Sequence, residues 1–204
     1  MPKISNILGQ QAFEAIRDQI AAILADEIDG QGVLTYDPDF LKMQVFVESV
    51  NPEDKEEFPF VNVSLATGSW PDLKAYNGDI KGNYIYNIDC YANSPSNSQA
   101  EGDNLAGVKL QKILGICRAI LENPIYKTLD YAPGFVWRVS MQDLNIRNES
   151  KEANGDALNT RMGRLTYLVE VQENVQLLIG QPLTDWTTQV SLNQTNDGYF
   201  YQGI

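Results

Sequence analysis

The side chains that could do chemistry in this chain are carboxylates and two cysteines, because its 204 residues include no histidine. Histidine is the commonest general base and a frequent zinc ligand, so its absence removes every Ser-His and Cys-His nucleophile pair. A carboxylate enzyme or an oxygen-ligated metal site stays open on residue types alone. The acids are scattered over turns, however, so we expect no enzyme, no metal and no cofactor.

The stretches closest to a metal site are acidic turns. Asp37 and Asp39 flank a proline, but the spacing of an EF-hand is absent. Residues 51–57 are strongly acidic and predict a solvated hairpin loop. The chain lacks the Gly-x-Gly-x-x-Gly, Walker A, Cys-x-x-Cys and Gly-x-Ser-x-Gly motifs. For Cys90 and Cys117 we expect two buried free thiols, with a disulfide as the alternative.

Composition restricts the class of partner. The net charge of −12 argues against binding to phosphate backbones, which requires clustered Lys and Arg. No run approaches the roughly 18 apolar residues of a membrane helix, and the first residues show no signal-peptide core. We therefore expect no membrane association, no specific nucleic-acid binding and synthesis in the cytoplasm.

The stretch that must position everything else is 83–92, which alternates as a strand with two useful faces. The residues expected on one face are Tyr84, Tyr86, Ile88 and Cys90. Those expected on the other are Ile85, Asn87, Asp89 and Tyr91. Asp89 lies on the more polar face, so a structural role is favoured for it. We predict a central strand on which two helices pack.

Two amphipathic helices flank this strand in the sequence. The first is predicted over residues 9–28, where apolar residues recur every three or four positions and Gly30 and Gly32 stop the helix. The second is predicted over 98–122, from a capping-box spacing at Ser98 to the Asn123-Pro124 break.

Four further strands and two loops complete the predicted fold. The strands are expected at 42–49, 58–66, 135–144 and 161–173, and the loops at 67–82 and 145–160. In the strand at 135–144 we expect Phe135, Trp137, Val139 and Met141 on one face. The fold class is α+β: a mixed or antiparallel sheet of about five strands with two helices on one face, a long β-hairpin arm and a C-terminal extension. We divide the chain into a domain at 1–173 and an extension at 174–204.

Candidate interface residues are aromatic or charged side chains in the loops and the extension. Aromatic rings in a loop or near a chain end need cover from their own domain or from a neighbour. A polar loop as long as 145–160 is usually functional or orders on binding. The candidates are Trp70, Tyr76, Glu149, Lys151, Glu152, Trp186, Tyr199, Phe200 and Tyr201.

Four stretches carry a resemblance to a known family. They read Phe-Pro-Phe-Val-Asn-Val-Ser-Leu at 58–65, Tyr-Ile-Tyr-Asn-Ile-Asp-Cys-Tyr-Ala at 84–92, Arg-Ala-Ile-Leu-Glu-Asn-Pro at 118–124 and Gly-Arg-Leu-Thr-Tyr-Leu-Val-Glu-Val at 163–171. With the order of elements over 9–173, the chain resembles the tail-terminator, or tail-completion, proteins of tailed bacteriophages. The extension at 174–204 exceeds the compact core usual in that family.

The resemblance implies a virion protein that forms a homo-hexameric ring, caps the tail tube and joins the tail to the head-side connector. Its implied partners are copies of itself, the tail tube protein, the connector or neck protein and the tail sheath, with DNA passing through the channel without specific binding. The family has no catalytic residues to carry over. Three alternatives stay open: another head–tail neck protein, a carboxylate hydrolase or metal enzyme, and a non-catalytic α/β ligand-binding module.

Overall fold

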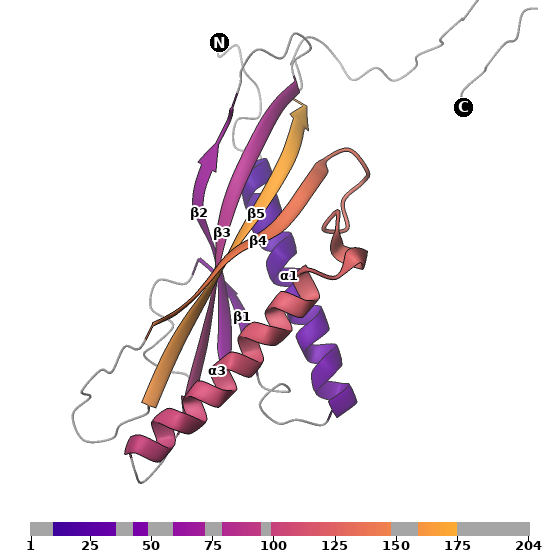
Figure 1. Ribbon diagram of the computed structural model, residues 1–204. Helices are drawn as coiled ribbons and strands as arrows, with labels where there is room; N and C mark the ends of the chain where they lie inside the picture. Colours follow the sequence, from indigo (N-terminus) through magenta and orange to yellow (C-terminus); the bar gives the residue numbers. More distant parts are fainter. Residues whose placement is uncertain are drawn as a thin grey trace, which may run out of the picture. The chain divides into compact units, whose positions relative to one another are not determined.

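The computed structural model describes residues 10–35, 43–48, 59–71, 79–94, 99–147 and 159–174, all within a compact unit that spans 8–175 (Figure 1). The helical elements are α1 (Ala12–Thr35), α3 (Gln99–Leu121) and the short 3-10 helix η2 (Pro124–Tyr126). The strands are β1 (Gln44–Val47), β2 (Phe60–Ser69), β3 (Asp79–Ser94), β4 (Val136–Arg147) and β5 (Asn159–Asn174).

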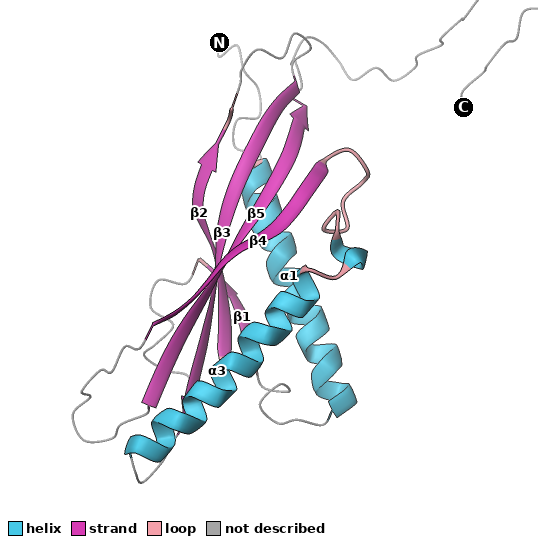
Figure 2. Cartoon of the chain, in the orientation of Figure 1, coloured by secondary structure: helices cyan, strands magenta, loops and turns pink. Residues whose placement is uncertain are grey.

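The five strands form one mixed sheet in the order β1-β2-β3-β5-β4 (Figure 2). Strand β3 is the middle strand and pairs antiparallel with both β2 and β5, while β4 pairs antiparallel with β5. The predicted α+β class with a five-stranded sheet and a central strand at 83–92 is therefore confirmed. Strand β1 runs parallel to β2, so the prediction of a hairpin around 51–57 is wrong, because a hairpin joins antiparallel strands.

The side chains on one face of β3 line the sheet side of the hydrophobic core. Tyr84, Tyr86, Ile88 and Cys90 are all at most 1% exposed, as the alternation predicts. Both helices cover this face and contribute to a single core cluster. Helix α1 packs against β1 and β2, whereas α3 packs against β3 and β5. The residues contributed by the helices and by β5 include Ile20, Leu24, Leu110, Leu114, Cys117, Leu165, Tyr167 and Val169.

Buried tyrosine hydroxyls in this core donate to helix carbonyl groups. Tyr86 Oη donates to the Phe13 carbonyl at 2.8 Å, and Tyr167 Oη donates to the Leu121 carbonyl at 3.2 Å. Burial raises the pKa of both phenols well above the ordinary value. The two contacts anchor the N-terminal part of α1 and the C-terminal end of α3 to the sheet.

The glycines that mark the end of the first predicted helix do not end it. Helix α1 continues through Gly30 and Gly32 to Thr35. Gly32 is buried and lies one turn beyond the buried Ile28, so it prolongs the packed side of the helix. Packing of this kind outweighs the penalty of roughly 1 kcal/mol for a glycine inside a helix.

Glycines also mislead in the predicted loop 67–82, because β2 and β3 both extend into it. A Cβ atom on Gly68 would lie 3.1 Å from the Tyr84 ring, and one on Gly82 would lie 2.8 Å from its Cζ atom. These glycines make room for Tyr84 within the sheet rather than breaking the strands.

Strand β4 departs from the predicted alternation at Trp137. A bulge lies between Val136 and Arg138 in the pairing with β5. Val136 takes the inner position and is 4% exposed, whereas Trp137 is 59% exposed. The prediction that Trp137 shares a face with Val139 and Met141 is therefore wrong, because a β-bulge inserts one residue and shifts the alternation.

The β4–β5 pair forms the predicted hairpin, but its strands run further than expected, to Arg147 and from Asn159. The remainder of the predicted arm, 148–158, lies outside the described residues, as does 175–204. On the inner face of β5, Leu165, Tyr167 and Val169 are fully buried, which confirms the prediction for that strand.

Candidate interaction surfaces

Only Trp70 among the predicted interface residues lies in the described part of the chain. It follows the end of β2, and its side chain is 49% exposed. The others fall outside the described residues: Tyr76, Glu149, Lys151, Glu152, Trp186, Tyr199, Phe200 and Tyr201.

Trp70 belongs to a cluster with Tyr84 and Glu173 at one end of the helix-covered face. The Trp70 and Tyr84 rings meet edge to face with centroids 6.0 Å apart. The Tyr84 hydroxyl donates to the Glu173 carboxylate, and the Trp70 side chain also hydrogen-bonds to it. Burial raises the pKa of Glu173, although the hydrogen bond from Trp70 works in the opposite direction. The cluster fixes one edge of the indole and leaves about half of the Trp70 surface to solvent.

A second apolar surface, which the sequence reasoning missed, lies on β4. Leu144 and Ile146 are 46% and 39% exposed, although they pair with Leu165 and Gly163 on the face that the helices cover elsewhere. They are exposed because α3 packs over β3 and β5, one strand further in. We call Leu144 and Ile146 the β4 strip. It lies on an outermost strand of the described sheet, where strands commonly meet other chains.

The sequence contains a signal for the β4 strip. The alternation Leu144-Asn-Ile146 continues into the segment predicted to be a polar loop from residue 145. The predicted loop boundary truncated this pattern. A second bulge, between Met141 and Asp143, keeps Leu144 on the apolar face.

On the face of β3 opposite α1 and α3, the buried Asp89 pairs with the partly exposed Arg164. The guanidinium donates two hydrogen bonds, from Nε at 2.6 Å and from one terminal nitrogen at 2.8 Å. Asp89 is only 4% exposed, and the two residues are cross-strand neighbours on β3 and β5. The hydrogen bonds to Asp89 raise the pKa of Arg164, against the effect of its partial burial. The geometry supports the structural role predicted for Asp89.

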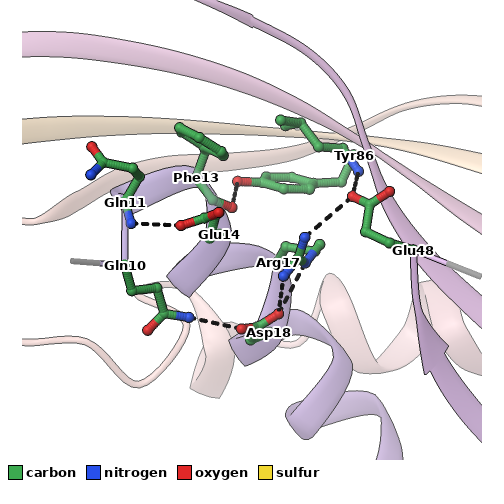
Figure 3. Close-up of polar contacts among 9 residues, drawn as sticks. Gln10, Gln11, Phe13, Glu14, Arg17, Asp18, Glu48 and Tyr86 are labelled. Carbon is green, nitrogen blue, oxygen red and sulfur yellow. Dashed lines mark hydrogen bonds and ion pairs between the residues drawn. The ribbon is translucent and has the colours of Figure 1, made fainter. Parts of the chain in front are cut away.

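Arg17 on α1 holds the other sheet edge together (Figure 3). Glu48, just after β1, accepts hydrogen bonds from the Leu65 backbone amide at 2.9 Å and from Arg17 at 3.5 Å. Arg17 also pairs with Asp18 at 2.7 Å. Burial works against the charged guanidinium, but these two carboxylates outweigh it and raise the pKa of Arg17. The contacts explain how a strand of four residues keeps its place beside β2.

Within the described ranges, no three residues among His, Cys, Asp and Glu gather closely enough to hold a metal ion. Cys90 and Cys117 are free and buried, as predicted. None of the helices in the described part of the chain is long and apolar enough to cross a membrane. Exposed apolar side chains in the described part of the chain include those of Trp70 and of the β4 strip.

Comparison with known proteins adds no family. No protein-family model matches the chain, and no curated protein matches its sequence.

Proposed function

We propose that this chain is a structural subunit that associates with copies of itself and acts as a ring-forming tail terminator of a tailed bacteriophage. In this role it caps the tail tube and joins the tail to the head-side connector. It is made in the host cytoplasm and ends in the neck region of the virion. The tail tube protein, the connector and the tail sheath are its proposed neighbours, and DNA passes the ring without specific binding.

The observation that carries the proposal is the β4 strip. Two large aliphatic side chains are exposed on an outer strand of the described sheet. Single exposed apolar residues are ordinary, but adjacent ones on an edge strand typically mark association sites. A subunit that buries the strip against a second copy removes this surface from water.

Charge supports an apolar contact between copies. Each chain has a net charge of −12, so two copies repel each other at long range. An uncharged strip lets them meet without placing like charges face to face. Salt screens the repulsion between exposed charges and leaves apolar contact intact, so association should strengthen as ionic strength rises.

The first test is the solution mass, measured by light scattering after size exclusion over a range of protein and salt concentrations. The expected result is a closed hexamer of about 137 kDa, six times the 22.8 kDa chain, with a larger hexamer fraction at higher salt. The purified protein should also bind purified tail tube protein. Binding to the connector alone would favour a neck protein instead. A strict monomer that binds neither would reject the proposal and favour a ligand-binding module.

The interface test replaces the β4 strip with smaller polar residues, as Leu144→Ser with Ile146→Thr. This variant should lose the hexamer at concentrations where the wild type is assembled, while its far-UV circular dichroism stays native. The matched control is Val108→Ser on α3, another exposed apolar residue at 60% exposure, which should leave the mass unchanged. An unchanged hexamer in the strip variant would show that the contact lies elsewhere.

A further inference from the structure

Helix α3 approaches the sheet closely above Gly163 and Cys90, which are cross-strand neighbours on β5 and β3. A Cβ atom on Gly163 would lie only 2.6 Å from Leu114 Cδ1. The missing side chain therefore lets Leu114 rest directly on the strand backbone. Cys117 follows Leu114 by three residues and faces the same way, so it is carried down onto β3.

This approach brings two thiols together inside the core. Cys117 Sγ lies 3.9 Å from Cys90 Sγ, and both residues are 0% exposed. Both are free cysteines. A disulfide bond is about 2.05 Å long, so the sulfurs need to approach by roughly 1.9 Å, within reach of rotations of the two side chains and slight settling of the helix.

We propose that Cys90 and Cys117 form an intramolecular disulfide when the folded chain meets a two-electron oxidant such as hydrogen peroxide, so that the central strand becomes covalently linked to α3. One thiol loses its proton, and its sulfur attacks a peroxide oxygen and breaks the O–O bond. The products are a sulfenic acid and one water. The second sulfur then attacks the sulfenic sulfur, and the hydroxyl leaves with the thiol proton as a second water. Two thiols are oxidised by two electrons, and one peroxide is reduced to two waters.

Burial sets the rate and the selectivity of this reaction. The hydrogen bond with Cys117 and burial both raise the pKa of the Cys90 thiol, so little thiolate is present in the closed structure. Oxidation therefore proceeds through openings of α3 and is slow. When α3 packs on the sheet again, the two sulfurs are adjacent, so the intramolecular disulfide forms faster than a disulfide with a thiol of another molecule. We expect Cys90 and Cys117 to remain thiols in a reducing compartment and to form the disulfide in an oxidising one.

The inference does not depend on the proposed assembly role and is testable on the purified full-length protein. The reduced protein is treated with hydrogen peroxide in native buffer, then denatured and alkylated with N-ethylmaleimide. The expected product has lost two hydrogen atoms and carries no alkyl group. After trypsin, the peptides 82–109 and 113–118 should be joined, because Lys81, Lys109, Lys112 and Arg118 bound them.

Two controls separate the native pair from chance oxidation. Cys90→Ala and Cys117→Ala each keep one thiol and should give no internal link. The circular dichroism spectrum must stay native during oxidation, because an unfolded chain with two cysteines can also form an intramolecular disulfide. The thermal midpoint should rise on oxidation of the wild type and stay unchanged in Cys117→Ala.

Two results would overturn the inference. In the first, the protein treated with peroxide in its native state carries two alkyl groups after denaturation and alkylation, although a sample treated with the same peroxide in urea forms the disulfide. In the second, the linked protein melts below the reduced one, because the bond would then form only at the expense of native packing.

Discussion

Adjacent residues on the two faces of β3 are buried in different surroundings. Cys90 faces the helices and lies 0% exposed in an apolar core. Asp89, one residue earlier, is 4% exposed on the face without helices, where Arg164 neutralises it through two hydrogen bonds. The helix-covered face depends on shape, because a single methyl group at Gly163 would collide with Leu114. The opposite face combines this ion pair with a small buried cluster of Phe60, Tyr91 and Met162.

This difference indicates what each face is suited to. A close-packed apolar face tolerates no change of volume and holds the fold together. An ion pair contributes little net stability when it is intact, but removing one partner leaves a buried charge without its counter-ion, which is costly. Substitutions on the two faces should therefore lower the free energy of unfolding for different reasons.

The largest effect is expected on the polar face, from Arg164→Met. The substitution keeps the aliphatic length of the side chain but leaves the Asp89 carboxylate buried without its cation. Removing one partner of a buried ion pair is strongly destabilising, and we expect a loss of about 3 kcal/mol in the free energy of unfolding. Urea denaturation followed by circular dichroism measures it.

The double variant Asp89→Asn with Arg164→Met is the control for this prediction. It removes the buried charge as well, so it should recover at least half of the lost stability. A single variant that loses less than about 1 kcal/mol would show that water already reaches Asp89 and that the pair does not organise this face.

The next effect is expected on the apolar face, from Gly163→Ala. The new methyl group must push Leu114 and with it α3 away from β5. Overpacking of this kind typically costs 1–3 kcal/mol, and we expect about 2 kcal/mol in urea denaturation. The same change at Gly115, on the exposed side of α3 with open space around it, should instead stabilise the protein by up to about 1 kcal/mol. Equal effects at the two glycines would contradict the close approach of α3.

Local patterns predicted the centre of this fold well. The alternation of Tyr84, Tyr86 and Ile88 predicted the central strand and its inner face, because a strand buried under helices leaves a clear two-residue period. The same logic predicted the inner face of β5. Fold class followed from the order of such elements.

The errors came from positions where contacts distant in sequence override a local signal. Gly32 and Gly82 are typical chain breakers, yet one lies on the packed side of a helix and the other makes room for Tyr84 in a sheet. The bulge that exposes Trp137 depends on register with β5, which the residues of β4 alone do not specify. Strand β1 likewise has contacts that are distant in sequence, such as that of Glu48, just after β1, with Arg17 of α1.

The exposed apolar side chains were predicted only in part for a related reason. Trp70 was singled out because an aromatic residue in a loop signals a need for cover. The exposure of Leu144 and Ile146 was not predicted, because it depends on where α3 crosses the sheet. A sequence pattern shows which residues share a face of a strand, but only the packing shows how much of that face is covered.

The smallest effect concerns Glu173, at the end of the helix-covered face, where charge and burial meet. Burial raises the pKa of this carboxyl, so the folded protein holds its proton more tightly than the unfolded chain does. Its contribution to stability is full below the unfolded pKa of about 4.3 and is lost as pH rises through the higher folded pKa. Glu173→Gln has no proton to lose. The variant should therefore gain stability relative to wild type between pH 4 and pH 7, by less than about 1 kcal/mol because the group is only half-buried.

The measurement for Glu173 is urea denaturation of both proteins at the two pH values, and the quantity of interest is the difference between them. The hydrogen bond from Trp70 favours the ionised carboxylate, so it reduces this difference, but burial outweighs it. The matched control is Glu170→Gln on the opposite face of β5, where the carboxylate meets Arg138 at 3.4 Å and the substitution should lose a few tenths of a kcal/mol at pH 7. A gain at Glu170 equal to that at Glu173 would mean that general charge repulsion in a chain of net charge −12, rather than burial at the helix-covered face, sets the pH dependence.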